Sequence, residues 1–97
     1  ESSGASIILL ECVPVSLAKK ITETLSIPVI GIGAGPHTDG QIMVMHDMLG
    51  ITPKEIKVPK FVKNFMSLST DGIRGAFKAY ALAVRDGEFP SPKESFE

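Results

Sequence analysis

Apolar runs alternate with a stretch of helical periodicity over the first third of the chain. Residues 7–13 (IILLECV) are apolar apart from the single charge of Glu11, a pattern typical of a parallel strand covered on both faces. Residues 27–32 are again short, apolar and β-branched, which favours a second strand. Between them, apolar residues recur at helical spacing at Leu17, Ala18, Ile21 and Leu25. The pattern predicts strand, helix and strand, joined as a right-handed parallel crossover.

The next segment has an ambiguous periodicity. Residues 36–40 form a polar connection that is too short for a crossover helix. Within residues 41–48, the unbroken apolar sequence of residues 42–45 favours a third strand. Asp39 as an N-cap and Gly50 as a C-terminal stop would instead suit a short helix. We expect the strand and keep the helix as the alternative.

The second half of the chain is expected to be a loop followed by helices. Residues 53–59 contain two prolines and read as a loop, and residues 60–66 could form two helical turns. A longer helix is expected from an N-cap at Thr70 to a stop at Gly87. Its predicted apolar face consists of Ile73, Phe77, Tyr80, Ala81 and Val84. Residues 90–97 lack periodicity and should be mobile or lie on a neighbouring part of the protein.

Composition limits the classes of partner. The 97 residues suffice for one small domain or part of one, and 43% of them are hydrophobic, enough to build a core. Ten basic and eleven acidic residues give a formal charge of −1, which argues against general attraction to nucleic acid or anionic membrane. No apolar run approaches the ~18 residues of a membrane span. The single Cys12, inside an apolar run, is expected to be a reduced, buried thiol in a cytoplasmic protein.

Glu11 is the most informative candidate for chemistry. An unpaired carboxylate in a buried strand costs several kcal/mol unless it is partnered, protonated or at the open end of the strand. One interpretation is a general base whose pKa is tuned by apolar surroundings. The other is a carboxylate at the sheet edge that accepts backbone hydrogen bonds or pairs with a lysine. Sequence spacing alone leaves both open.

Residues 31–35 (GIGAG) partly resemble a dinucleotide-binding fingerprint. Pro36 stands where the last glycine of that pattern would be, and no long helix is predicted to start after the turn. Gly33 and Gly35 are therefore better explained by positive φ angles or by close approach of the backbone to a neighbour or a ligand. Because parallel strands end at one edge, this turn and Glu11 should share it.

His46 and Asp47 follow the third apolar run, where a barrel strand would present them to a substrate or a metal ion. A lone His-Asp pair is a poor metal signal, so we favour a structural or supporting role and assign no metal ligand in this segment. No Ser-His-Asp set, Walker lysine or paired-cysteine site can be assembled. The remaining basic candidates, expected to be solvated on helical surfaces, are Lys60, Lys63 and Lys78.

Several motifs together resemble one enzyme family. Residues 9–14 (LLECVP), 27–35 (IPVIGIGAG), 38–47 (TDGQIMVMHD) and 59–65 (PKFVKNF) are similar to ketopantoate hydroxymethyltransferase, in the order that the family has them. The resemblance implies the C-terminal portion of a (βα)8 TIM-type barrel of the phosphoenolpyruvate/pyruvate-binding kind. Residues 1–97 would be the C-terminal segment of that single α/β-barrel domain, with its last strands and C-terminal helices. A whole barrel needs about 250 residues.

The same resemblance implies a reaction. The family transfers a hydroxymethyl group from 5,10-methylenetetrahydrofolate to 3-methyl-2-oxobutanoate, giving 2-dehydropantoate (ketopantoate) for pantothenate and coenzyme A biosynthesis. By match to the LECVP motif, Glu11 would be the proton acceptor. Mg2+ would hold the 2-oxo acid through carboxylates on strands outside this segment. The resemblance also implies a homo-oligomer, and we expect the segment alone to be inactive.

Two hypotheses from other functional classes remain open alongside the enzyme hypothesis. The chain could be a non-catalytic interaction or oligomerisation piece, in which case replacing Glu11 would change nothing beyond stability. It could also be a small nucleotide-binding α/β module centred on the turn at residues 33–35, although the altered glycine spacing argues against that.

Overall fold

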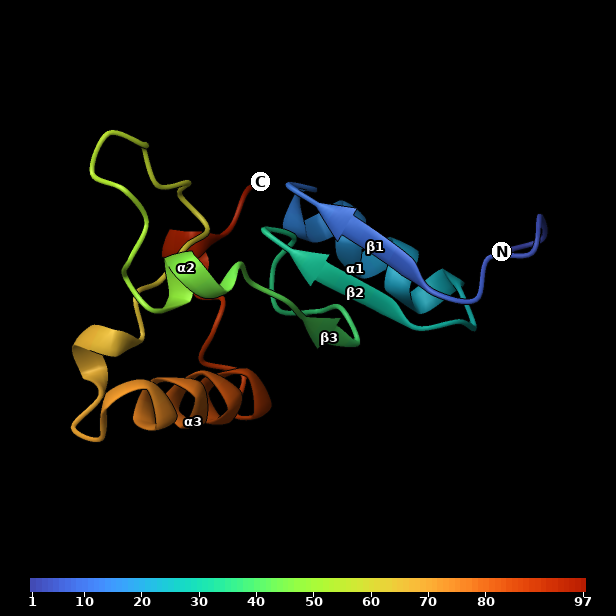
Figure 1. Ribbon diagram of the computed structural model, residues 1–97. Helices are drawn as coiled ribbons and strands as arrows, with labels where there is room; N and C mark the ends of the chain where they lie inside the picture. The colour runs from blue at the N-terminus through green and yellow to red at the C-terminus, as the bar shows by residue number, and fades with distance from the viewer.

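The computed structural model describes residues 1–97, beginning with a parallel β-α-β unit (Figure 1). Strand β1 (Ile8–Glu11) pairs in parallel with β2 (Val29–Ile32), and helix α1 (Val15–Thr24) connects them. A two-residue strand, β3 (Gly40–Gln41), pairs in parallel with the other edge of β2, so the strand order is β1-β2-β3. The predicted strand-helix-strand pattern is confirmed, and the outer edges of β1 and β3 are unpaired.

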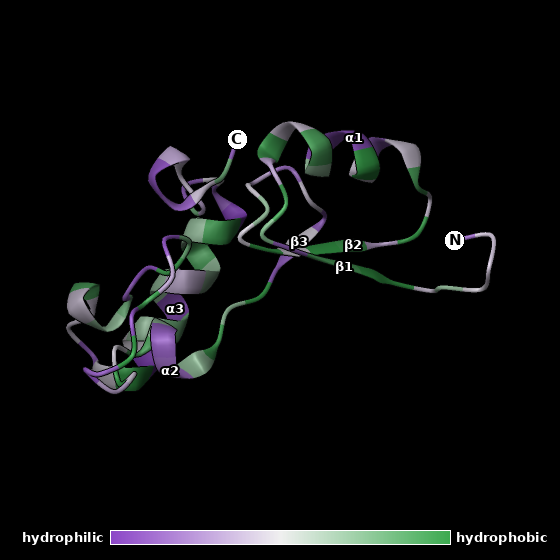
Figure 2. Cartoon of the chain, turned by 90° about the horizontal axis from the view of Figure 1, so that it is seen from above, coloured by the Kyte–Doolittle hydropathy of each residue, from purple (hydrophilic) through white to green (hydrophobic).

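Helix α1 covers one face of this sheet and leaves the opposite face of β1 exposed. The buried side chains between α1 and the sheet include Ala18 and Val29, both fully inaccessible to solvent. Figure 2 shows α1 lying along one side of the strands. Because successive side chains of a strand point to opposite faces, Leu9 and Glu11 share the face away from Val29, and Leu9 is 56% exposed. The expectation that β1 is covered on both faces is therefore wrong for this chain.

The second half of the chain packs around its own aromatic core. Its elements are α2 (Met45–Met48), the 3-10 turn η1 (Met66–Leu68), α3 (Gly72–Arg85) and the 3-10 turn η2 (Pro92–Glu94). The rings of Phe65, Tyr80 and Phe89 meet edge to face with centroids 5.3 to 5.9 Å apart. The buried members of this cluster are Met48, Leu49, Phe65, Ala76, Ala83 and Phe89.

The third strand predicted over residues 42–45 is wrong, and so is an Asp39 N-cap. Only Gly40 and Gln41 pair with β2, and the helix that follows begins at Met45, with Val44 as its N-cap residue. The Asp39 carboxylate instead accepts a hydrogen bond from the backbone N–H of Val29 at 2.8 Å. The apolar residues after β3 leave the sheet because Met43, Met48 and Leu49 pack into the aromatic core. Gly50, at φ 70°, does end the helix as expected.

The helix predicted over residues 60–66 does not form. The side-chain oxygen of Asn64 accepts hydrogen bonds from the backbone N–H groups of Met66 and Ser67, which holds a tight turn in place of a helix. Thr70 is not the N-cap of α3 either. Asp71 occupies that position, and Ser69 Oγ accepts a hydrogen bond from its N–H at 3.1 Å.

The buried face of α3 is rotated relative to the predicted one. Ala76 and Ala83 are buried, whereas Ile73 and Phe77 are 58% and 44% exposed. Of the five residues predicted to form the apolar face, only Tyr80 and Val84 pack against the core. Small residues face the core because the bulky Phe65 and Phe89 rings already fill the space beside the helix.

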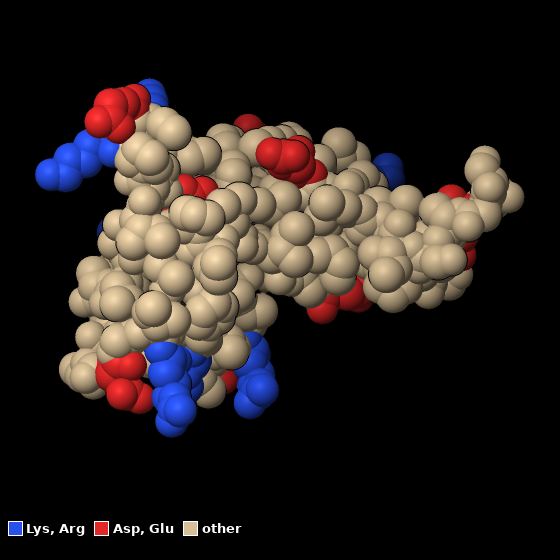
Figure 3. Space-filling view, in the orientation of Figure 1, with Lys and Arg blue, Asp and Glu red and all other residues tan.

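Charged groups are mixed in sign. Figure 3 shows few charged side chains over the sheet and charges of both signs around α3. None of the helices is both long and apolar enough to cross a bilayer.

Candidate functional site

The parallel strands bring the predicted site residues to one edge of the sheet. Glu11 is the last residue of β1 and lies opposite Ile32, the last residue of β2, in the strand register. Residues 33–35 follow directly. The prediction that Glu11 and the glycine turn share the carboxyl edge of the sheet is confirmed.

The Glu11 carboxylate is free and open to solvent. The residue is exposed, and the structure gives its side chain neither a hydrogen bond nor a lysine partner. In this chain the carboxylate is neither enclosed by apolar side chains nor paired, and of the expected ways to tolerate its charge the position at the open end of the strand is the observed one. An exposed carboxylate on the bare face of a parallel sheet, at its carboxyl edge, can accept a proton from a molecule bound against that face.

The chain turns sharply immediately after Glu11. Cys12 has φ 56°, the one non-glycine residue with a positive φ, and its backbone N–H donates to the carbonyl oxygen of Ile32 at 3.0 Å. A left-handed backbone at a residue with a side chain costs energy and persists only where the surroundings enforce it. The thiol is exposed, so the prediction of a buried cysteine is wrong.

Gly33 and Gly35 are glycines for steric reasons. Their φ angles are +66° and +80°. A Cβ atom on Gly33 would lie 2.7 Å from Phe61 Cδ2, and one on Gly35 would lie 2.7 Å from Val15 Cγ2. Positive φ and close approach were both predicted for this turn, and both are confirmed. No helix begins at the turn, because the next element is β3, so nothing there would direct a helix N-terminus at a pyrophosphate.

Gln41 fastens the glycine turn, a role that the sequence reasoning missed. Its side-chain amide nitrogen donates to the carbonyl oxygen of Gly35 at 2.8 Å and to Thr38 Oγ1 at 3.0 Å. Thr38 Oγ1 in turn donates to the carbonyl oxygen of Gly40 at 2.9 Å. The only hint in the sequence was that a polar residue, Gln41, precedes the apolar residues 42–45. The residues that its side chain contacts are seen only in the fold.

His46 and Asp47 do not stand at a strand end. Both lie on α2, and Figure 1 places α2 in the part of the molecule that contains α3. Asp47 Oδ1 accepts a hydrogen bond from Thr52 Oγ1, and His46 is exposed. Their predicted position at a barrel strand is wrong because the run became a helix. In these 97 residues no three His, Cys, Asp or Glu side chains are grouped as a metal site.

Residues 91–97, which we call the strap, lie across the start of α1. The carbonyl oxygen of Phe96 accepts a hydrogen bond from the backbone N–H of Val15 at 2.8 Å. Lys60 Nζ donates to the carbonyl oxygen of Ser95 at 2.7 Å. Residues 90–97 were expected to be mobile or to lie on a neighbouring part, and the second alternative is the observed one. Lys60 was expected to be solvated, so its contact with the strap was not predicted.

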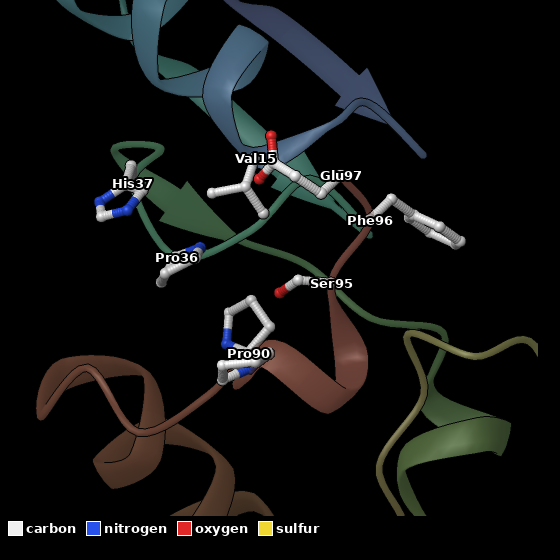
Figure 4. Close-up of a pocket in the computed structure, with 8 residues that line it drawn as sticks. Val15, Pro36, His37, Pro90, Ser95, Phe96 and Glu97 are labelled. Atoms are coloured by element: carbon white, nitrogen blue, oxygen red, sulfur yellow. The ribbon is translucent and has the colours of Figure 1, made fainter.

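A hollow of about 270 Å³ lies beside the strap. Figure 4 shows Val15, Pro36 and His37 on one side of it and Pro90 and Ser95 on the other. Glu11 does not line this hollow, so it is separate from the carboxylate that could carry chemistry.

Comparison with known proteins identifies the sequence family. The family description "Ketopantoate hydroxymethyltransferase" matches residues 1–92. A 3-methyl-2-oxobutanoate hydroxymethyltransferase 2 of Hahella chejuensis is 56% identical over 96 residues, and an enzyme named 3-methyl-2-oxobutanoate hydroxymethyltransferase from Buchnera aphidicola is 58% identical over 96 residues. Each alignment covers 99% of this chain and 35% of the relative. A Yersinia enterocolitica enzyme of the same name is 54% identical over 97 residues, 100% of the chain and 36% of the relative. The chain therefore spans about a third of the length of these relatives.

Proposed function

We propose that this chain, which belongs to the ketopantoate hydroxymethyltransferase family, forms part of an enzyme that transfers a hydroxymethyl group to 3-methyl-2-oxobutanoate. The donor would be 5,10-methylenetetrahydrofolate, and Glu11 would accept the proton. The observation that carries the proposal is the position of Glu11, unpaired and exposed at the carboxyl edge of a parallel sheet, on the face away from α1.

The bare face of the sheet supports a place in a (βα)8 barrel. In such barrels the helices lie outside, the opposite face of each strand points inward, and reactions take place at the carboxyl ends of the strands. Glu11 and Leu9 lie on the side that would be the interior. The unpaired edges of β1 and β3 would meet further strands. The proposal places residues 1–97 among the last strands and helices of that barrel.

The chemistry requires a base beside C3 of the 2-oxo acid. The C3–H bond breaks, its electron pair delocalises into the adjacent carbonyl as an enolate, and the proton passes to the Glu11 carboxylate. The enolate carbon then forms a bond with the methylene carbon of the folate. Both C–N bonds of that carbon break with uptake of one water molecule, which supplies the hydroxyl oxygen, and tetrahydrofolate leaves. Ile32, opposite Glu11 in the register and 9% exposed, provides an apolar neighbour on the same face.

Magnesium is implied by the family but has no ligand set here. Hard divalent cations need several oxygen ligands, and no group of three acidic or histidine side chains exists in this chain. The described residues therefore do not fit a magnesium site, and we assign them no step that passes through the metal. Self-association stays a prediction from the resemblance, and a cytoplasmic location stays a prediction from the single Cys12.

The direct test is removal of the Glu11 charge in the intact protein that contains this segment. Glu11→Gln should lower hydroxymethyl transfer by about 10² to 10⁴ fold, the usual contribution of a general base. Exchange of the C3 hydrogen of 3-methyl-2-oxobutanoate with deuterated water, measured by NMR without folate, should fall in parallel.

Glu23→Gln is the matched control, because Glu23 is an exposed glutamate on α1. It should leave both rates unchanged. If Glu11→Gln retains full exchange and transfer, Glu11 is only a carboxylate at the sheet edge. If the unmodified protein has neither activity, the enzyme hypothesis fails and the chain is better explained as an interaction piece or a nucleotide-binding module.

A further inference from the structure

The turn that follows Glu11 is held from its far end by a segment remote in sequence. Only three residues, Cys12 to Pro14, separate β1 from α1. Pro14 is the N-cap residue of α1 and supplies no side-chain cap. The first helical N–H groups are satisfied instead by the strap, since Val15 N–H donates to Phe96 O at 2.8 Å and Ser16 N–H donates to Glu97 Oε1 at 3.3 Å.

The strap is itself well anchored. Ser91 and Glu94 form a reciprocal capping box, and Ser95 Oγ donates to the carbonyl oxygen of Ser91 at 2.7 Å. Ser95 is only 7% exposed. Lys60 Nζ donates to the carbonyl oxygen of Ser95 and lies 5.3 Å from the centroid of the Phe96 ring.

The same ring links the strap to the second turn at the sheet edge. Phe96 and Phe61 meet edge to face, with centroids 6.5 Å apart and an interplanar angle of 65°. Phe61 lies so close to Gly33 that no side chain fits between them. Phe96 therefore connects the start of α1, through its carbonyl oxygen, with the glycine turn, through its ring.

We infer that the strap positions Glu11 and that Phe96 is its main positioning residue, an inference that rests on the proposed function of Glu11. The left-handed backbone of Cys12 persists only while both ends of the turn are fixed. One end is fixed by the Cys12 N–H to Ile32 O bond and the other by the strap. Loss of the strap would let Cys12 relax. The Glu11 backbone would stay in register with Ile32 of β2, but the Glu11 side chain, which has no hydrogen bond or ion pair, would lose its orientation.

The test uses Phe96→Ala in the intact protein that contains this segment, with Phe96→Tyr as the conservative variant and Phe77→Ala as the matched control. Phe77 is a half-exposed phenylalanine on α3, away from the strap. Phe96→Ala should lower kcat at least tenfold with a KM change below about threefold, because placement of the base acts on the chemical step. Phe96→Tyr should restore kcat, and Phe77→Ala should not change it.

Amide hydrogen exchange supplies the second readout, independent of activity. Phe96→Ala keeps the carbonyl oxygen that accepts from Val15 but removes the ring that contacts Phe61 and Lys60, so the strap should detach from α1. Peptides that cover residues 12–16 should then exchange at least tenfold faster, with exchange in α3 unchanged. Lys60→Met, which removes the donor to Ser95 without leaving a cavity, should reproduce a smaller increase if Phe96→Ala proves too unstable to purify.

Each result decides something. Unchanged exchange at residues 12–16 would show that the strap does not hold the turn. Faster exchange with unchanged kcat would show that the turn is held but that Glu11 is not positioned through it. If the unmodified protein is inactive, the proposed function fails, and the exchange measurement still decides whether the strap holds the turn.

Discussion

Gly33→Ala should destabilise the chain mainly through one steric contact with Phe61. Gly33 has φ +66°, and an added Cβ would lie 2.7 Å from Phe61 Cδ2 and 2.9 Å from Phe61 Cγ. Optimal carbon–carbon contacts lie near 3.5 to 4.0 Å, so the ring of Phe61 must move by most of an ångström. Phe61 is 8% exposed and has little room to move.

The magnitude follows from three contributions. A left-handed alanine costs about 1 to 2 kcal/mol relative to glycine, and forcing a methyl group into a packed site costs about 1 to 3 kcal/mol. The smaller entropy of the unfolded alanine chain returns about 0.4 to 1 kcal/mol. The expected net loss in the free energy of unfolding is about 3 kcal/mol, between limits of about 1 and 5 kcal/mol, a large part of the stability of a small domain.

Gly87→Ala is the control that isolates the backbone contribution. Gly87 has φ +75°, and no heavy atom lies within 4 Å of the position of its Cβ. Gly87→Ala should lower the free energy of unfolding by only about 1 kcal/mol. Urea unfolding followed by far-ultraviolet circular dichroism is suitable, because the chain has no tryptophan.

A double-mutant cycle completes the test. In a Phe61→Ala background, the cost of Gly33→Ala should fall close to that of Gly87→Ala, because the two closest atoms, Cδ2 and Cγ, are gone. Equal losses for Gly33→Ala and Gly87→Ala in the unmodified background would refute the argument that Phe61 restricts this position.

Three further perturbations have defined outcomes. Tyr80 has a buried hydroxyl without a hydrogen-bond partner, so Tyr80→Phe should raise the free energy of unfolding by up to about 1 kcal/mol in thermal melts. Burial raises the pKa of Tyr80, so above about pH 10 the unfolded chain loses the phenol proton before the folded chain does. The free energy of unfolding should therefore fall as the pH rises above that value. Tyr80→Phe should lack this contribution to the pH dependence. Phe65→Ala should lower the free energy of unfolding by about 3 to 5 kcal/mol, because Phe65 is only 1% exposed. Phe77→Ala, at a half-exposed position, should lower it clearly less in the same urea titration. Cys12→Val should lower the free energy of unfolding by about 2 kcal/mol, because a β-branched side chain tolerates φ 56° poorly. Cys12→Gly should not lower it. Equal losses for the two variants would contradict a strained turn.

Local sequence determined the first half of the fold and the glycine turn. The strand-helix-strand pattern followed from apolar periodicity, because a short β-α-β unit buries residues that are close in sequence. The shared edge of Glu11 and residues 33–35 followed from parallel pairing alone. Positive φ at Gly33 and Gly35 followed from the lack of another role for closely spaced glycines.

Tertiary packing decided what periodicity left ambiguous. Residues 42–45 have the composition of a strand, but Met43 and Met48 are drawn into a core built around Phe65 and Phe89, far along the chain. The same packing rotated α3 so that Ala76 and Ala83 face inward. Such choices depend on which large rings occupy the interior, and no local pattern records that.

The environment of Glu11 was also a matter of tertiary structure. Sequence marked the residue, through one charge in an apolar strand and through the family motif, but an apolar run does not show which face of a strand is covered. The fold places α1 on one face only, leaves Glu11 on the other, and brings Phe96 from the far end of the chain to the turn that follows it. Contacts between residues about eighty positions apart depend on the path of the whole chain, so only the three-dimensional structure could reveal the strap.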